Sequence, residues 1–227
     1  MKNTINIGIP SKGRLRKDVL KIFKRKKLKL ISERGERDLI GSIKNKKNLK
    51  IFYLHAREII ERLGDGSLDI GFSGFDLFKE SEFNIQKKIN LVKKYDFGKA
   101  NLVVAIPDPW IDVQTVADLE EIAFEFRDKK RKRLRVATKY PNLTRDFLFS
   151  KGVTQFQIVE SLGATEVYPF TGSANLISDI TSTGKTIKSN NLRILKDGEI
   201  LKSQACVFSS KKSFSKIGLK NIIKLFS

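Results

Sequence analysis

The sequence has few of the residues on which many catalytic and structural sites depend: among 227 residues there is one cysteine, one histidine and one tryptophan. A single cysteine, Cys206, excludes an intramolecular disulfide framework and any metal site built from several cysteines, and it fits a reducing compartment such as the cytoplasm. Because its neighbours are apolar, we expect Cys206 to be a core thiol and not a nucleophile. The histidine, His55, has no identifiable catalytic partner, so we expect a structural role for it.

Long apolar segments are also absent from the sequence. No N-terminal stretch has the apolar core of a signal peptide, and no run approaches the length of a membrane span. We therefore expect a cytoplasmic protein that is neither secreted nor inserted in a membrane. Hydrophobic residues make up 40% of the chain, which is enough for a packed core, and the length suits one large or two small domains.

Acidic residues are scarce relative to basic ones. The chain has 25 Asp plus Glu against 45 Lys plus Arg, a formal net charge of +20, with basic runs at 24–27 and 129–133. Such a charge would attract polyanions, and a basic nucleic-acid-binding protein is one interpretation. However, neither run contains an aromatic residue for base stacking, and no zinc-finger or helix-turn-helix signature accompanies them. We predict a solvated surface that steers anionic substrates, without specific nucleic-acid binding.

Apolar runs alternate with amphipathic segments along most of the chain, which favours an α/β fold with mainly parallel strands. The expected strands are 5–10, 49–53, 68–72, 102–106, 134–137, 157–160, 192–195 and 205–209. The expected helices are 14–27, 57–63, 116–127, 142–149 and 217–225. The first strand, loop and helix form a unit whose helix N-terminus could bind phosphate, supplemented by Lys12 and Arg14.

Two acidic residues and a dense run of hydroxyl residues mark the most informative part of the sequence. The stretches are 166–172, which begins with Glu166, and 179–186, which begins with Asp179. Ionised carboxylates accept hydrogen bonds from paired ribose hydroxyls, whereas serine, threonine and glycine offer hydroxyls and unobstructed backbone N–H groups to a phosphate. A phosphorylated ribose is one ligand that fits. The alternative is a capped helix end or a turn, which the same residues also favour.

The wider sequence resembles the ATP phosphoribosyltransferase family, specifically its short form, over nearly the whole chain. In that family the phosphoribosyl-diphosphate motif is an acid, a proline, a glycine and a second acid that runs into Thr-Gly-x-Thr. The matching positions here are Glu166, Pro169, Gly172, Asp179, Thr183, Gly184 and Thr186. Further matching stretches are 9–15, 69–77, 135–145 and 203–205. The chain departs from the pattern at Tyr168, usually Ala, at Asn175, usually Asp, at Asn101, often Arg, and in the loop 55–60.

The resemblance implies a fold of two α/β lobes with a substrate cleft between them, like type II periplasmic binding proteins. It implies a discontinuous first domain, 1–100 plus 188–227, and an inserted second domain, 101–187. The implied activity is transfer of the 5-phosphoribosyl group of phosphoribosyl diphosphate to N1 of the adenine of ATP, which opens histidine biosynthesis. Because that nitrogen has a neutral lone pair, the reaction needs no obvious histidine or cysteine catalyst. The alternative of a different class is a two-lobed solute-binding protein without catalysis, against which the missing export signal argues.

The resemblance also assigns residues to roles. Glu166 and Asp179 are the expected catalytic carboxylates that hold the ribose hydroxyls. The expected phosphoribosyl-diphosphate-binding residues are Thr181, Ser182, Thr183, Gly184, Lys185 and Thr186. The expected ATP-binding residues are Lys12, Gly13, Arg14, Ser73, Gly74 and Asp76, although Asp76 could equally cap the helix that follows it. Thr138, Lys139 and Tyr140 are expected near the substrates.

Two further expectations concern a cofactor and a partner. Mg²⁺ would neutralise the departing diphosphate, with much of its ligand shell coming from the substrate and no protein-only metal cage. The chain length matches a catalytic core without the C-terminal regulatory domain of the long forms. The family then implies a hetero-oligomer with a regulatory subunit that resembles histidyl-tRNA synthetase.

Overall fold

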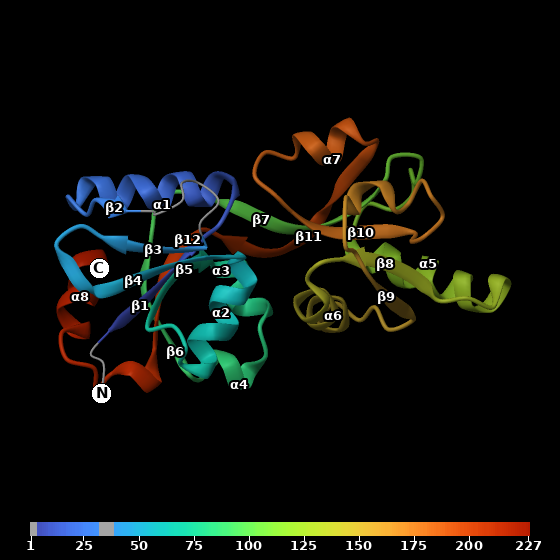
Figure 1. Cartoon of the computed structure of the whole chain (residues 1–227). Coiled ribbons are helices and arrows are strands. Elements are labelled where there is room, and N and C mark those ends of the chain that lie inside the picture. The colour runs from blue at the N-terminus through green and yellow to red at the C-terminus, as the bar shows by residue number, and fades with distance from the viewer. Residues whose placement is uncertain (1–3, 32–38) are drawn as a thin grey trace. The chain divides into compact units, whose positions relative to one another are not determined.

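The computed structural model describes residues 4–31 and 39–227. The chain divides into two compact units, one formed by Met1–Lys99 with Gln204–Ser227 and the other by Ala100–Ser203 (Figure 1). The chain therefore passes from one unit to the other twice. None of the helices in the described residues combines the length and the apolar character of a membrane span.

The first unit is built on one mixed sheet. Among the described residues its strand order is β2-β3-β4-β1-β5-β12-β6. The strands are β1 (Ile5–Pro10), β2 (Leu30–Ile31), β3 (Ile40–Ile43), β4 (Lys46–Leu54), β5 (Ile70–Gly74), β6 (Ile89–Lys94) and β12 (Ala205–Ser210). Only the central strand, β1, has parallel partners, β4 and β5, whereas the other described pairs are antiparallel. The expectation of a mainly parallel sheet is wrong here. One reason is the two-residue connection between β3 and β4, which only an antiparallel pair can have.

Helices cover both faces of this sheet (Figure 1). The helices are α1 (Gly13–Arg25), α2 (Ala56–Asp65), α3 (Phe75–Glu80), α4 (Phe83–Gln86) and α8 (Leu219–Phe226), and a short 3-10 helix, η2 (Lys211–Ser213), follows β12. Alternate residues of a strand point to opposite faces. The isoleucines of β1 pack with α1 and α8, whereas Gly8 and Gly71 face α2. A Cβ at Gly71 would lie 2.4 Å from the Ile59 side chain, so glycine lets α2 pack closely on the sheet.

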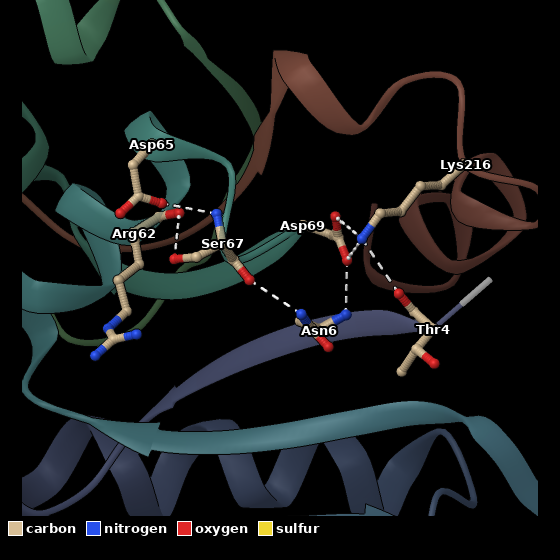
Figure 2. A network of polar contacts seen from close by, with 7 residues as sticks. All are labelled: Thr4, Asn6, Arg62, Asp65, Ser67, Asp69 and Lys216. Carbon is tan, nitrogen blue, oxygen red and sulfur yellow. Dashed lines mark hydrogen bonds and ion pairs between the residues drawn. The ribbon is translucent and has the colours of Figure 1, made fainter. Parts of the chain in front are cut away.

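A network of polar contacts ties the C-terminal segment to the start of β1 and β5 (Figure 2). Asp69 is fully buried, and Lys216 Nζ lies 2.8 Å from its Oδ1 and 2.9 Å from its Oδ2. The Asn6 backbone N–H donates to Oδ2 at 2.7 Å, and Lys216 also donates to the Thr4 carbonyl at 3.2 Å. The Asp69 charge is thus neutralised and hydrogen-bonded within the fold.

The second unit has its own mixed sheet, of order β11-β7-β10-β8-β9 in the described residues. Its strands are β7 (Ala100–Pro107), β8 (Leu134–Thr138), β9 (Phe156–Glu160), β10 (Leu176–Thr181) and β11 (Leu192–Ser203). β8 runs parallel to β9 and β10, whereas β7 runs antiparallel to β10 and β11. Leu119 of α5 (Val116–Lys130) and Leu148 of α6 (Pro141–Ser150) belong to the core on one face. Ile187 of α7 (Lys185–Ser189) belongs to the core on the other face, and Tyr168, which follows η1 (Thr165–Val167), packs against it.

The second crossing between the units differs from the expected domain boundary. The segment 188–203 was expected in the first domain, but β11 pairs with β7 along its length and belongs to the second unit. The register of β11 shifts between Ile194 and Glu199, which is a bulge around Asp197 and Gly198. Strand β11 continues through the polar residues of the bulge. The expected strand 192–195, an apolar run, therefore covers only the beginning of β11.

Candidate active site

Polar side chains gather at the carboxyl ends of the parallel strands β9, β8 and β10 in the second unit. The connection after β8 leads into α6, whose Leu148 packs on one face of the sheet, whereas the connection after β10 leads into α7, whose Ile187 packs on the opposite face. In open α/β sheets, ligands bind outside the carboxyl ends of strands whose connections diverge in this way. The residues at these strand ends are therefore the candidate site of this unit.

Asp179 is the central acid of this edge. Its neighbour Ser178 pairs with Thr138 of β8, so Lys139, one residue beyond Thr138, comes beside Asp179. The Ile180 backbone N–H donates to Asp179 Oδ1 at 2.8 Å. Burial raises the pKa of Asp179 and the negative charge of Glu166 adds to this, whereas the Ile180 N–H, the Lys139 ammonium and the Thr165 hydroxyl lower it. The fold thus brings the charges of Glu166 and Lys139 near Asp179.

The hydroxyl-rich loop after β10 leads into the short helix α7. Gly184 has a left-handed backbone with φ of 73°, a conformation that glycine adopts at little cost. Its N–H donates to Thr181 Oγ1 at 2.9 Å, and the Lys185 N–H donates to Thr183 Oγ1 at 3.4 Å. The side chains of Ser182, Thr183, Lys185 and Thr186 are exposed. Hydroxyls of the loop therefore hold its own backbone while other polar side chains face solvent.

Only one of the three residues expected near the substrates at the end of β8 is exposed. Thr138 is fully buried, and its Oγ1 accepts from the Tyr140 N–H at 2.9 Å and lies 3.3 Å from Thr144 Oγ1. Tyr140 is 6% exposed, whereas Lys139 is exposed to solvent. Thr138 and Tyr140 therefore belong to the frame of the site, and Lys139 is the residue whose charge acts at the edge.

The residues that depart from the family pattern contact other residues of the chain. Asn175 Oδ1 accepts from the Arg135 N–H at 2.8 Å, and the Asn175 N–H donates back to the Arg135 carbonyl at 2.8 Å. An aspartate could accept the same bond, so this substitution retains the link between β8 and the start of β10. Asn101 Nδ2 donates to Glu199 Oε2 across β7 and β11 at 2.8 Å. Tyr168 packs on the core near α7.

The first unit has a second polar edge, also at the carboxyl ends of parallel strands. Lys12, Gly13 and Arg14 follow β1 and are exposed in or beside the first turn of α1. A pocket of about 90 Å³ lies at the ends of β1 and β4, lined by Pro10, Ser11, Lys12, Leu15, Leu54, His55 and Ala56. Because α1 and α2 leave these strands toward opposite faces, this is again a point where connections diverge.

The remaining residues expected to bind ATP lie at the end of β5, the other neighbour of β1. Ser73 is fully buried, and its hydroxyl donates to the Ala56 carbonyl at 2.8 Å. Asp76, in the first turn of α3, is 7% exposed and folds back toward Gly74, where a Cβ would lie 2.1 Å from its Oδ1. His55 caps α2, since its Nδ1 accepts from the Arg57 N–H at 3.3 Å. This cap is a structural contact of the kind expected for His55.

Two residues at the candidate site of the second unit were missed from the sequence. Ser161 follows β9 and Thr165 precedes Glu166, and their hydroxyl oxygens are 3.0 Å apart in a buried position. The signal available was a threonine next to Glu166, one of the two expected catalytic acids. No group of three or more His, Cys, Asp or Glu side chains suited to a metal occurs in residues 4–31 and 39–227.

Comparison with known proteins identifies the family. The sequence pattern that describes ATP phosphoribosyltransferase, HisG, matches residues 55–227. The ATP phosphoribosyltransferase of Rhizobium etli (strain CIAT 652) is 42% identical over 92% of this chain and 91% of its own length. The chain belongs to the ATP phosphoribosyltransferase family. The predicted resemblance to this family is therefore confirmed.

The coverage of relatives differs. The ATP phosphoribosyltransferase of Nitrobacter winogradskyi is 46% identical over 94% of this chain but over 66% of its own length, so the chain spans about two thirds of that relative. A solved ATP phosphoribosyl transferase (HisG:HisZ) complex from Thermotoga maritima matches 98% of this chain and 95% of the matched chain, at 25% identity and a TM-score of 0.75. The ligand-binding core of GluR0 in complex with L-glutamate matches with a TM-score of 0.57 at 11% identity, which shows the fold alone. The predicted two-lobed α/β class is confirmed.

Proposed function

We propose that the chain transfers the 5-phosphoribosyl group of phosphoribosyl diphosphate to N1 of the adenine ring of ATP. The products are phosphoribosyl-ATP and diphosphate, and the reaction is the first step of histidine biosynthesis. Membership of the family supports this activity. The observation that carries it is the Asp179 cluster, in which two acids and a lysine meet beside a hydroxyl-rich loop.

The cluster suits a phosphorylated ribose. Asp179 and Glu166 are acceptors for the 2- and 3-hydroxyls of the sugar, since an ionised carboxylate accepts several hydrogen bonds and donates none. The exposed side chains of the 181–186 loop would hold the 5-phosphate, with Lys185 supplying a positive charge. The half-buried position of Asp179 strengthens its interaction with a ligand because less water screens the charge.

The bond changes require no proton transfer from the protein. The lone pair of adenine N1 forms the bond to ribose C1, and the electron pair of the C1–O bond leaves with diphosphate. The sugar gains positive character as this bond breaks, and the carboxylates of Glu166 and Asp179 would stabilise that charge. The chain otherwise contributes position, holding the ribose so that C1 faces its nucleophile.

ATP and Mg²⁺ complete the proposal. Lys12 and Arg14 are exposed cations beside the first turn of α1, and they would hold the triphosphate, with Asp76 and the Ser73-Gly74 strand end beside them. Mg²⁺ prefers oxygen ligands, which Glu166, Asp179 and the loop hydroxyls offer beside those of the diphosphate. When bound, the ion would neutralise the charge of the leaving diphosphate.

A partner subunit is part of the proposal. The matched Thermotoga maritima structure is a HisG:HisZ complex. We propose that this chain likewise assembles in the cytoplasm with a regulatory subunit that resembles histidyl-tRNA synthetase, through which histidine inhibits the reaction.

The test is incubation of the chain with ATP, phosphoribosyl diphosphate and Mg²⁺, with and without that subunit, while phosphoribosyl-ATP is followed. Formation of product in either condition supports the activity. Binding of phosphoribosyl diphosphate without product in both would indicate a non-catalytic ligand-binding protein. Full activity with histidine inhibition by the chain alone would contradict the partner.

A further inference from the structure

A cluster of positive charge in the first unit lies outside both candidate edges. Residues 19–31 and 39–50 contain six and four Lys or Arg, respectively, and no Asp or Glu. The two segments meet in the fold, because β2 pairs with β3 and the Lys44 N–H donates to the Lys29 carbonyl at 2.9 Å. The end of α1 and the β3–β4 turn therefore bring like charges close to one another, which repel.

An apolar pocket of about 340 Å³ lies within this cluster, between the end of α1 and β2. Its apolar lining residues are Leu20, Phe23, Leu28 and Leu30. The other lining residues are the exposed lysines Lys24, Lys27 and Lys29. We call this pocket, together with these three lysines and Lys44, the basic pocket. It combines an apolar surface with positive charge, and so suits a ligand that has both an apolar part and negative charge.

The second basic run of the sequence, 129–133, differs because its helix supplies partners. Lys129 Nζ lies 3.0 Å from Glu125 Oε1, and Lys130 Nζ lies 3.9 Å from the centre of the Phe126 ring. None of the ion pairs in residues 4–31 and 39–227 involves a lysine of the basic pocket. The described part of the fold thus leaves the charge of the basic pocket available to a ligand.

The basic pocket is too far from the polar edge of the first unit to act on a ligand there. Strand β4 runs from Lys46, beside the cluster, to Leu54, which lines the pocket at that edge. At about 3.3 Å per residue the two ends of β4 are roughly 25 Å apart. Exposed charges are screened over about 8 Å at physiological ionic strength. Attraction of a substrate to the edge therefore does not explain this cluster.

The backbone at Lys27 also favours a role for the lysine side chain. Lys27 follows the C-cap of α1 and has a left-handed φ of 55°. Glycine is the usual residue at this position because it adopts the conformation without a steric cost. The chain instead has a lysine that lines the pocket.

We propose that the basic pocket is a docking site for an acidic segment of another protein. One large apolar side chain of that segment enters the pocket, and Asp or Glu side chains beside it pair with the lysines. Nucleic acid supplies the charge but no apolar side chain, and the lining residue Phe23, 1% exposed, is too buried for base stacking. A second copy of the chain would be repelled, since it also has a net charge of +20. This docking is independent of the proposed transferase activity.

The first test selects binders from a random display library of short peptides on the full chain. The enriched peptides should carry Asp or Glu beside a large apolar residue. Binding of an enriched peptide, followed by fluorescence anisotropy, should weaken at least about tenfold in the combined variant Lys24→Glu, Lys27→Glu and Lys29→Glu. Binding by the wild type should also weaken as salt is added, because salt screens exposed charges.

The matched control changes the net charge equally at the second basic run. It combines Lys130→Glu, Lys132→Glu and Arg133→Glu, all at exposed positions, and should bind the peptide like the wild type. Enriched peptides without acidic residues, or an equal loss of binding in both combined variants, contradict the proposal. If the Lys-to-Glu variant of the basic pocket does not fold, the Lys-to-Gln variant at the same three positions is held to the same criterion.

The second test concerns the apolar anchor. Alanine in place of the large apolar residue of the peptide, or Leu20→Gln in the pocket, should each weaken binding. An alanine peptide that binds as well as the original would reduce the site to general attraction of charge and overturn the proposal. Tighter binding to phosphatidylserine vesicles or to single-stranded RNA, lost in the Lys-to-Glu variant, would overturn it in favour of a membrane or a nucleic acid.

Activity separates this site from the candidate active site. The Lys-to-Glu variant of the basic pocket should form phosphoribosyl-ATP at the wild-type rate, and a lost activity in a folded variant would assign the lysines to substrate binding instead. If the wild-type chain forms no phosphoribosyl-ATP, the proposed function fails, and peptide binding still decides whether the basic pocket is a docking site.

Discussion

Each unit has an aspartate at a strand, but at different ends: Asp69 of the first unit lies just before its strand, whereas Asp179 of the second lies toward the carboxyl end of its strand. Asp69 precedes β5, is fully buried, and has the Lys216 ammonium 2.8 Å away together with a backbone N–H (Figure 2). Asp179 lies in the carboxyl half of β10, is half-buried, accepts a hydrogen bond from the Ile180 N–H, and has a cation and an acid nearby. The first carboxylate is paired with a cation inside the fold, whereas the second lies at the strand ends of the candidate site. The environment of an aspartate, more than its burial alone, thus separates a structural role from a functional one.

The largest expected effect comes from breaking the Asp69 network. Lys216→Met leaves a buried carboxylate without its cation and should lower the free energy of unfolding by about 3 kcal/mol, the lower end for a buried pair, because Lys216 keeps 32% of its side chain exposed. Urea denaturation measures this change. The control is Lys220→Met, which removes an exposed lysine of α8 and should have little effect.

Adding Asp69→Asn to Lys216→Met removes the unpaired charge and should recover part of the lost stability. Each of these variants that folds should keep the wild-type KM for phosphoribosyl diphosphate. A Lys216→Met protein as stable as the wild type would show that the network contributes nothing to stability.

The next effect concerns Asp179, where we expect a loss of activity without a loss of stability. Asp179→Asn keeps the shape of the side chain but removes the charge, and we expect kcat/KM for phosphoribosyl diphosphate to fall by about 100-fold. Because burial already disfavours the ionised form, the free energy of unfolding near neutral pH should not decrease. Steady-state kinetics and urea denaturation on the same preparation check both statements. Unchanged turnover would remove Asp179 from the site.

The smallest effect is a shift in the pH dependence of kcat/KM. Donor binding needs ionised Asp179, so kcat/KM for phosphoribosyl diphosphate should fall on acidification at a pH above the ordinary range of an aspartate, because burial raises the pKa. Lys139→Gln removes a charge that lowers this pKa, and should move the acid limb to higher pH. Glu166→Gln removes a charge that raises it, and should move the limb to lower pH.

The shift in each pH profile is measured against the wild type, whatever the absolute rate of the variant. Shifts of the same sign in both variants would show that the limb does not report Asp179. Lys188→Gln, an exposed change on α7, is the matched control and should leave the limb in place.

Much of the fold could be predicted because buried strands are short apolar runs. The expected strand 5–10 coincides with β1, and 102–106 and 134–137 lie inside β7 and β8. β10 was missed because Leu176–Thr181 mixes polar and apolar residues, and it was interpreted as part of the phosphoribosyl-diphosphate motif. The partners of these polar residues lie on other elements, as with Thr144 of α6, whose hydroxyl contacts Ser178. The local sequence pattern does not reveal such partners.

The candidate site was predicted in its acids and its loop but not in its supporting contacts. Glu166, Asp179 and the 181–186 loop followed from a motif that is local in sequence. The Ser161 N–H donates to the Thr138 carbonyl at the end of β8, and Asn175 contacts Arg135, 40 residues earlier. A side chain's partner is set by packing between distant elements, so residue type and spacing alone could not assign it.

The sequence by itself determined the family, the alternation of strands and helices, the excess positive charge and the motif that contains Asp179. Only the tertiary structure decided which of two similar aspartates is neutralised. Lys216 reaches Asp69 from 147 residues along the chain, and the pairing of β8 with β10 sets Lys139 beside Asp179. The physical reason is that the ionisation and orientation of a carboxylate depend on the charges and hydrogen-bond donors within a few ångströms, and folding alone brings those groups together.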